Sequence, residues 1–384
     1  MTTELLQSGW TDLDPAELRF ILLERIGRPG QYDGRDNNPN TFYLPLAGDS
    51  CRIKLTFSDS KQIVAIEPGP AFDAAKWEQV VEEIERTGPI RVGRDCSFSS
   101  FRVAGSWRGK RSGVQILPPP ADAPRAPFEI AEHPFILEYP VKVSDRWPIT
   151  NFRRMREHRQ LTFLLNVLIA GRTSFQPRRQ RDLWAIVHEK GGTDQKVKWV
   201  QEFYFANFGE AIRDELSPPA AETLEEVDPE TYYATVGHDG RGLRVPADLD
   251  DSICCYTRLS KGNRDNFGRA GFWMDMASRQ WTVSFSASFA SLAIAIEALG
   301  ERSMRPTKRF TTFIEQYAPG ASLKAGREKM YAMRSDILHG SGLMEIDQDA
   351  DFGWAPPEKK EEDLLSELWG LTRIAIRNWL QDPT

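Results

Sequence analysis

Residues 330–340 read Met-Tyr-Ala-Met-Arg-Ser-Asp-Ile-Leu-His-Gly, and the interpretation of the whole chain starts from this stretch. Its apolar residues recur three and four positions apart, and Gly340 and Gly342 follow its end. The spacing predicts a helix over 323–338 that stops at Gly340. Each helical residue advances about 100° around the axis. On that wheel one arc is apolar, and it contains Leu323, Met330, Tyr331, Met333, Ile337 and Leu338.

Arg334 falls in the middle of this apolar arc. A guanidinium that faces a core is costly unless it is paired or opens onto a polar cleft, so we expect a polar group opposite it. Glu297 is a candidate, because it is an acid in the otherwise apolar segment 288–299. The segment alone also allows Glu297 to face solvent, and both readings stay open.

His339 ends the same predicted helix, where the helix dipole favours the imidazolium form. Histidine changes charge near neutral pH and can act there as an acid or a base. The spacing from Arg334 to His339 is not distinctive by itself, because Arg153 with His158 and Arg181 with His188 are similarly spaced. Only Arg334 combines a core-facing position with a histidine at a helix end.

Residues 331–340 resemble the Arg-x4-6-His signature of HEPN domains, and their sequence is close to the motif of the Apea-like HEPN group. The segment 288–299 resembles the "ALE" helix of that group. The resemblance covers roughly residues 250–380. It implies a helical bundle, ribonuclease chemistry, and a dimer in which two signatures face one cleft. The implied site residues are Glu297, Arg334, Ser335, Asp336 and His339, with Ser335 standing where the family more often has Asn, Asp or His.

The composition is that of a globular protein with several cores. A chain of 384 residues suggests two or three domains, and 40% hydrophobic residues, with 11 Trp and 21 Phe, can fill them. The formal charge of −6 is unremarkable. Any nucleic-acid surface is therefore expected to be local.

Several classes of site and location are not expected. The four cysteines form neither a disulfide framework nor a paired metal-binding spacing, so no metal and no cofactor are expected. The start of the chain lacks a basic region before an apolar run, and the longest apolar stretch, 161–170, is too short to span a bilayer. We expect a cytoplasmic protein. A phosphate loop at 105–111 is rejected, because its spacing is one residue short and Arg111 replaces the Ser or Thr.

The order of patterns along the chain predicts an α+β fold. Residues 1–148 read as a small α+β domain with a helix capped by Asp14, two strands at 51–57 and 61–66, and a helix capped by Asp73. Residues 149–249 read as a middle region with a helix capped by Thr150 or Asn151 and a strand-rich segment. Residues 250–384 read as a helical bundle with helices at 285–299, 309–317, 323–338 and 363–379.

The middle region begins with the clearest basic patch of the chain. Between 151 and 181 one acid, Glu157, faces eight arginines, which are Arg153, Arg154, Arg156, Arg159, Arg172, Arg178, Arg179 and Arg181. The patch is either a solvated helix end and loop or a surface that follows an RNA backbone, with Phe175 available for stacking.

One arginine and one histidine suit metal-independent cleavage of RNA. Histidine can take the proton of a 2′-hydroxyl, and arginine can hold the phosphate oxygens while charge builds on phosphorus. On an ideal helix Arg334 and His339 lie about 140° and about 7.5 Å apart. They can share one phosphate only if the helix unwinds near Leu338 or if two chains share the site.

Two functions therefore stay open. The first is an endoribonuclease in a bacterial defence or toxin role, acting as a homodimer on RNA. The second is a non-catalytic HEPN module that dimerises or binds RNA or nucleotide, with an antitoxin or another defence protein as partner. A weaker version of the second is an inactive partner of a nucleotidyltransferase-like protein.

Overall fold

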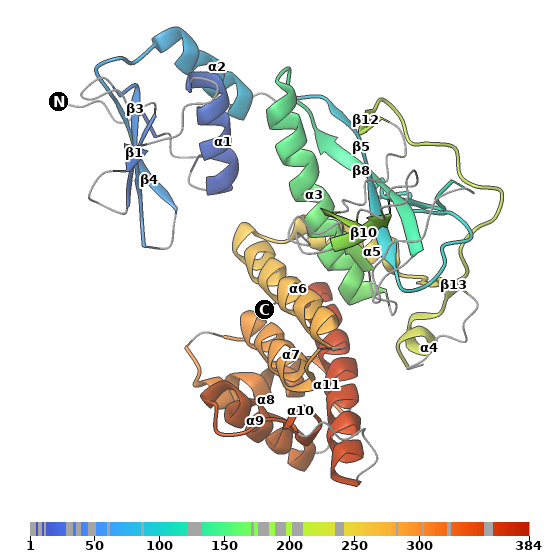
Figure 1. The fold of residues 1–384 in the computed structure, drawn as a ribbon. Helices are drawn as coiled ribbons and strands as arrows, with labels where there is room; N and C mark the ends of the chain where they lie inside the picture. The colour runs from blue at the N-terminus through green and yellow to red at the C-terminus, as the bar shows by residue number, and fades with distance from the viewer. Residues whose placement is uncertain are drawn as a thin grey trace. The chain divides into compact units, whose positions relative to one another are not determined.

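The structure is a computed structural model that describes most of the chain. The described residues are 5–6, 10, 13–27, 34–35, 40–44, 51–59, 62–85, 88–120, 133–169, 173–175, 184–188, 197–201, 210–234, 242–281, 283–301, 303–320, 324–348 and 356–383. The chain forms two compact units, and Figure 1 colours their elements by position in the sequence. The first unit comprises 1–92 and 140–157, and the second comprises 93–139 and 158–384.

The fold is α+β, as predicted, with a mainly helical region over 249–381. The two units are interleaved along the chain, whereas the predicted segments 1–148, 149–249 and 250–384 are consecutive. Three elements contribute residues to both units, which explains the interleaving. They are β5 (Ile90–Ser99), β8 (His133–Lys142) and α3 (Trp147–Leu168).

The first unit places two helices beside a small antiparallel sheet. The sheet order is β1-β2-β3-β4, and its strands are Gly34–Arg35, Thr41–Leu44, Ile53–Phe57 and Ile63–Pro68. The helices are α1 (Pro15–Ile26) and α2 (Ala74–Glu85). The predicted caps are confirmed, because Asp14 accepts hydrogen bonds from the N–H groups of Ala16 and Glu17, and Asp73 caps α2 in the same way.

Helix α3 begins earlier than predicted. The sequence suggested Thr150 or Asn151 as its cap, but the helix starts at Trp147. The Ser144 hydroxyl accepts a hydrogen bond from the N–H of Arg146. The Thr150 hydroxyl accepts one from the N–H of Ser144 and donates one to the carbonyl of Ser144. Thr150 therefore lies in the first turn of α3, and its hydroxyl stabilises the loop that precedes the helix.

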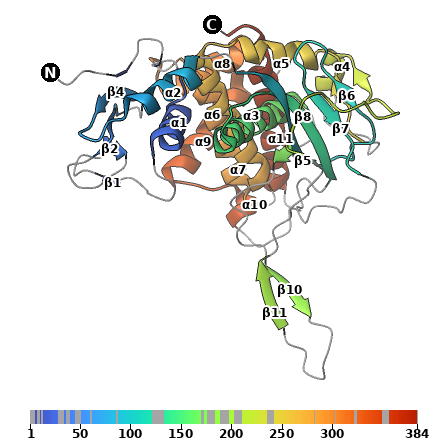
Figure 2. The same cartoon turned by 90° about the horizontal axis from the view of Figure 1, so that it is seen from above.

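The second unit contains a six-stranded sheet. Its order is β12-β5-β8-β7-β6, with β9 paired to β5. The remaining strands of this sheet are β6 (Trp107–Arg108), β7 (Gln115–Leu117), β9 (Thr173–Phe175) and β12 (Ile212–Arg213). Two further pairs are β10 (Trp184–His188) with β11 (Val197–Gln201), drawn as a hairpin in Figure 2, and β13 (Glu226–Val227) with β14 (Val245–Pro246).

The helical region of the second unit surrounds α7 (Phe285–Leu299), which is buried on most of its sides. It packs against α6 (Lys261–Gln280), α8 (Pro306–Tyr317), α9 (Lys324–His339), α10 (Glu345–Gln348) and α11 (Pro356–Gln381). Helices α4 (Pro229–Ala234) and α5 (Leu249–Arg258) precede them. The four predicted bundle helices are thus present, and α5, α6 and α10 are additional.

One continuous apolar core joins this bundle to the sheet and to the second half of α3. Ile116 and Leu137 of the sheet, Leu164 of α3, and Phe289 and Ile296 of α7 all belong to it and are almost completely buried. The bundle is therefore part of a larger compact unit. It shares its core with residues from 93–139.

Gly271 on α6 shows how closely α3 and α6 approach each other. A Cβ at Gly271 would lie 2.8 Å from the Cβ of Phe163, whereas one at Gly268 of the same helix would meet nothing within 4 Å. A contact to a Cβ cannot be relieved by rotating a side chain. The two helices could not keep their spacing with a larger residue at Gly271.

Substitution of these two glycines should therefore have opposite effects. Gly271→Ala should lower the free energy of unfolding by about 1–3 kcal/mol because of overpacking. Gly268→Ala should raise it by about 0.5–1 kcal/mol, since alanine is the better helix residue in open space. Urea denaturation of both variants measures this. Equal stabilisation by both substitutions would show that α6 does not pack on α3 as described.

Candidate functional site

Helix α9 carries the signature, and it packs against α7 and α8 as the apolar arc requires. Met330 is fully buried, and Tyr331, Met333 and Ile337 are partly buried against the main core. Leu338 departs from the prediction, because it is 41% exposed. It lies in the last turn of the helix. Leu323 lies outside the described residues.

Arg334 pairs with Glu297 across the bundle. Its Nη2 donates to Glu297 Oε2 over 2.8 Å, and each side chain is only 12% exposed. The expected polar group opposite Arg334 is therefore present, and Glu297 is that group rather than a solvent-facing acid. The side chain of Tyr331 lies beside the pair, with its ring centre 5.7 Å from the guanidinium carbon.

This ion pair is incompletely bonded. Glu297 Oε1 and Arg334 Nε are both buried, and neither has a hydrogen-bond partner among the described residues. Burial raises the pKa of Glu297, and the opposing charges of Arg334 and Arg309 do not bring it back to its ordinary value. The loss of hydration thus outweighs the attraction of the two guanidinium groups for this carboxylate.

His339 is the exposed last residue of α9, and the helix ends immediately after it. Gly340 has a φ of +69°, its N–H bonds to the carbonyl of Ile337, and the N–H of Ser341 bonds to the carbonyl of Asp336. This pattern of bonds is a Schellman motif, which glycine favours because it needs a left-handed residue. The predicted stop at Gly340 is confirmed.

Helix α9 does not unwind between Arg334 and His339. Arg334 is held inside the bundle, whereas His339 is exposed at the helix end, so the offset of about 140° expected for an ideal helix remains. Ser335 is partly buried and Asp336 is exposed. The Asp336 carboxylate accepts a bond from the Ser341 hydroxyl and supports the turn. The arginine and the histidine therefore start from different sides of α9.

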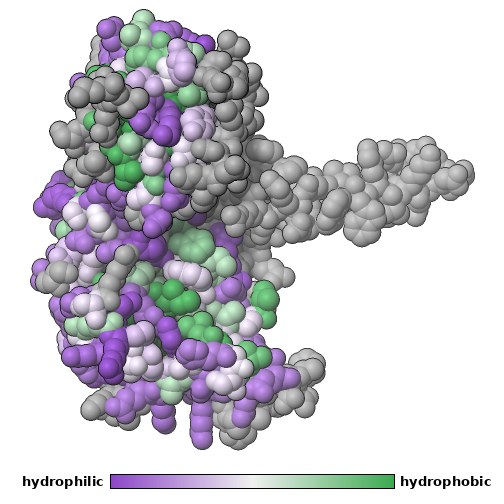
Figure 3. Space-filling model, turned by 90° about the vertical axis from the view of Figure 1, so that its left-hand side faces the viewer, coloured by the Kyte–Doolittle hydropathy of each residue, from purple (hydrophilic) through white to green (hydrophobic). Residues whose placement is uncertain are grey.

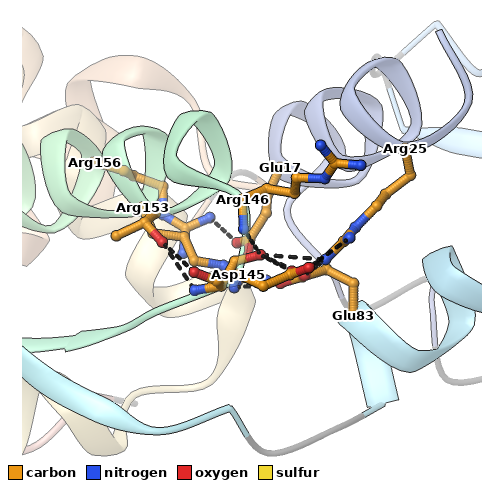
Figure 4. Close-up of polar contacts among 9 residues, drawn as sticks. Glu17, Arg25, Glu83, Asp145, Arg146, Arg153 and Arg156 are labelled. Carbon is orange, nitrogen blue, oxygen red and sulfur yellow. Dashed lines mark hydrogen bonds and ion pairs between the residues drawn. The ribbon is translucent and has the colours of Figure 1, made fainter.

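Two arginines of the basic patch belong to a buried ion network in the first unit (Figure 4). Arg153 is only 3% exposed, and it donates to Glu17 over 2.6 Å and to Glu83 over 2.7 Å. Arg156 pairs with the other oxygen of Glu17, and Arg25 pairs with Glu83 and Asp145. The structure therefore places Arg153 away from the surface and between two carboxylates, whereas Arg156 is paired with Glu17 and its side chain remains 25% exposed.

The other arginines of the patch differ in placement. Arg154 is partly buried and donates to the side-chain oxygen of Asn151. Arg159 is exposed, with its guanidinium 5.2 Å from the ring centre of Phe163. Four predicted RNA-binding residues lie outside the described residues, and these are Arg172, Arg178, Arg179 and Arg181. Among the described arginines of the patch, Arg159 is the one placed on the surface.

Asp347 supports the site but was not selected from the sequence. Its carboxylate accepts hydrogen bonds from the N–H groups of Phe285 and Ser286 and from the Ser284 hydroxyl, at the start of α7. Burial alone would raise the pKa of Asp347, but the hydrogen bonds from Ser286, Ser284 and Phe285 lower it below the ordinary value. The chain that follows His339 is thereby fixed to the helix that carries Glu297. An Asp a few residues after a helix stop gives no sequence signal of such a role.

The structure also brings together three residues of the kind found in hydrolases. Ser97 Oγ lies 2.7 Å from His158 Nε2, and Asp95 Oδ1 lies 4.0 Å from His158 Nδ1. Ser97 is completely buried, and 4.0 Å is too long for a hydrogen bond. The Tyr139 hydroxyl donates to Asp95 instead. These residues form a polar network in the core, and no substrate can reach the serine as it stands.

The rejected phosphate loop has a structural explanation. The N–H groups of Arg111 and Ser112, which a phosphate would need, donate to the Asp250 carboxylate. These bonds outweigh the opposing effect of burial and lower the pKa of Asp250. The turn at 109–113 is therefore tied to the first turn of α5 through the Asp250 side chain, which takes up the N–H groups that a phosphate would need.

Three further kinds of evidence bear on the site: possible metal ligands, membrane-spanning helices and similarity to known proteins. Within the described ranges, His, Cys, Asp and Glu side chains form no group of three that could hold a metal ion. None of the described helices is both long and apolar enough to cross a membrane. The chain matches no protein-family model, no curated protein and no solved structure. The resemblance to HEPN domains thus rests on the signature residues and their placement.

The corrected role of Arg153 predicts how it differs from Arg159. Arg153→Met should lower the free energy of unfolding by about 2–4 kcal/mol, because Glu17 and Glu83 lose a partner inside the network. Arg159→Met should cost less than about 1 kcal/mol. Chemical denaturation at neutral pH measures both. An Arg153→Met protein as stable as its parent would contradict the network.

The same pair of variants should respond differently to acid. The arginine charges hold the pKa of Glu17 below its ordinary value, although burial alone would raise it. The stability that Glu17 contributes is present above the unfolded pKa and is lost as the pH falls through the folded pKa. The difference between Arg153→Met and the parent should therefore shrink on the acid side.

Proposed function

We propose that this protein is a cytoplasmic, metal-independent endoribonuclease that acts as a homodimer in a bacterial defence or toxin role. The observation that carries the proposal is the placement of the signature on α9. Arg334 is held in the bundle by Glu297, and His339 stands exposed at the end of the helix. A cation that is fixed in position and an exposed acid–base group are what cleavage of RNA by its own 2′-hydroxyl requires.

In the proposed reaction His339 takes the proton of a 2′-hydroxyl. The 2′-oxygen then attacks the adjacent phosphorus, and the bond from phosphorus to the 5′-oxygen breaks. Arg334 holds the non-bridging oxygens while negative charge builds on them, a role that suits its planar and permanently charged group. The leaving 5′-oxygen takes a proton from water, and His339 returns the proton that it took to the solvent. The products are a 2′,3′-cyclic phosphate and a 5′-hydroxyl, and DNA is not cleaved because it lacks the nucleophile.

The uninterrupted course of α9 to His339 supports the proposed homodimer. Since one chain directs Arg334 and His339 to different sides, the phosphate must be bound by Arg334 of one copy and His339 of the other. Two apolar side chains flank His339 in the sequence and are exposed, Leu338 by 41% and Leu343 by 50%. Figure 3 shows apolar patches among hydrophilic side chains on the helical bundle. Such residues around a shared cleft would favour pairing of two chains.

RNA binding outside the cleft is assigned to the exposed part of the basic patch. Arg159 is its member among the described residues, and Arg172, Arg178, Arg179 and Arg181, which lie outside them, are proposed from the sequence alone. Contacts of this kind would hold the phosphate backbone without reading sequence. We therefore expect the target to be chosen by RNA structure or by a partner.

A second candidate function is a non-catalytic HEPN module. It is favoured by the ion pair itself, because an arginine that is 12% exposed and bonded to Glu297 also suits a packing role. In that case the bundle would dimerise, or bind RNA, a nucleotide, an antitoxin or a nucleotidyltransferase-like protein. Activity would then reside elsewhere.

Cleavage by variants of the pair separates these functions. The purified parent should cut mixed RNA in EDTA, and His339→Ala should lose about 10²–10⁴-fold in rate while keeping its RNA affinity, since it loses proton transfer. Arg334→Lys should also fail, because lysine keeps the charge but not the two-pronged geometry. Melting curves serve as the control for folding. If folded His339→Ala and Arg334→Ala proteins cut RNA like the parent, the module is the better account.

A further inference from the structure

We propose that the Glu297 carboxylate fills the anion site of Arg334 in the free protein, and that a backbone phosphate of RNA must displace it in order to bind. The identity of the anion rests on the proposed function. The pair would then be a lock on the site and would hold RNA affinity below what the arginine alone could give.

The hydrogen bonding of Arg334 leaves room for such an exchange. A guanidinium and a carboxylate bind most strongly through two parallel hydrogen bonds. Among the described residues, Arg334 makes one hydrogen bond to Glu297, and the second carboxylate oxygen is left without a partner. Arg334 therefore binds Glu297 through one N–H group, and its other N–H groups can donate to a further acceptor.

The hydration of Glu297 points in the same direction. Its pKa is raised by burial even though Arg334 and Arg309 oppose that change. A carboxylate whose burial outweighs its attraction to nearby cations loses little when it moves towards water. A pair with only a structural role would more cheaply be two apolar residues of similar size. The pair is thus poised for exchange.

A second arginine also acts on the Glu297 carboxylate. Arg309 on α8 donates to the carbonyl oxygens of Glu301 and Met304 over 3.0 and 3.1 Å. Its side chain occupies space that Gly300 leaves open, because a Cβ at Gly300 would lie 2.3 Å from Arg309 Cγ. The positive charges of Arg334 and Arg309 both favour an anion at this place.

The consequence is a competition between two anions for Arg334. While Glu297 is bound, an approaching phosphate meets its negative charge at close range and finds one donor already used. Neutralising residue 297 should therefore strengthen the binding of phosphate. If Glu297 only positioned Arg334, its substitution would weaken the binding of phosphate, because the guanidinium would then adopt several orientations.

The test is the affinity of the full chain for a 2′-O-methyl RNA oligonucleotide, which lacks the attacking hydroxyl and stays intact. Glu297→Gln should bind it about tenfold more tightly than the parent at low salt, because a charge close to the phosphate is removed. Glu328→Gln is the matched control, since it removes an exposed carboxylate from α9. That control should change the affinity by less than about twofold, because exposed charges are screened.

A second pair of variants guards against trivial explanations. Glu297→Asp keeps the charge but shortens the side chain by one methylene, so it should raise the affinity for the oligonucleotide by about threefold. This variant carries the test alone if Glu297→Gln does not fold. Adding Arg334→Gln to Glu297→Gln should abolish the gain. A folded Glu297→Gln or Glu297→Asp protein that binds the oligonucleotide no better than the parent overturns the lock.

The lock and the ribonuclease can fail separately. If Glu297→Gln binds more tightly while neither it nor the parent cuts unmodified RNA, the lock stands and the ribonuclease is wrong. If the parent cuts RNA but Glu297→Gln gains no affinity, the ribonuclease stands and Glu297 merely positions Arg334.

Discussion

The ion pair between Arg334 and Glu297 is the interaction on which the proposed site depends. It places a guanidinium on the core-facing side of α9, where an apolar residue would cost less free energy. Glu297, an acid on the central helix α7, holds that guanidinium in place. The pair is incompletely bonded, and its acid is poorly hydrated. A structural element that is costly and unsaturated is more readily explained by a ligand than by stability alone.

The residues around the pair fix its surroundings from several directions. Gly340 ends α9 through a left-handed residue, so His339 stands at the helix end. Asp347 then ties the following chain to the start of α7, the helix that carries Glu297. Arg309 adds a second positive charge to the field at Glu297. These contacts connect the end of α9, the chain that follows it and the start of α7 around the ion pair.

The local parts of this arrangement could be predicted from the sequence, and the long-range parts could not. The period of the apolar residues located α9, and one acid in an apolar helix made Glu297 a candidate partner, because both are patterns within a few turns. The sequence alone still allowed Glu297 to face solvent. Helix α6 was missed because Gly262, Gly268 and Gly271 weaken its pattern, although Gly271 is needed where Phe163 approaches. Arg153 was misjudged for a related reason. Its partners Glu17 and Glu83 lie far away in the sequence, so a charge cluster looked free of partners when it was not.

The most direct test of the account is complementation between two inactive variants. Arg334→Ala and His339→Ala proteins are prepared separately, mixed under conditions that allow subunits to exchange, and assayed for RNA cleavage in EDTA. If two chains share each site, a mixed dimer contains one site with both groups intact. Random exchange then restores up to roughly a quarter of the parent activity. A mixture that exchanges subunits but stays as inactive as its components would contradict a site shared between two chains.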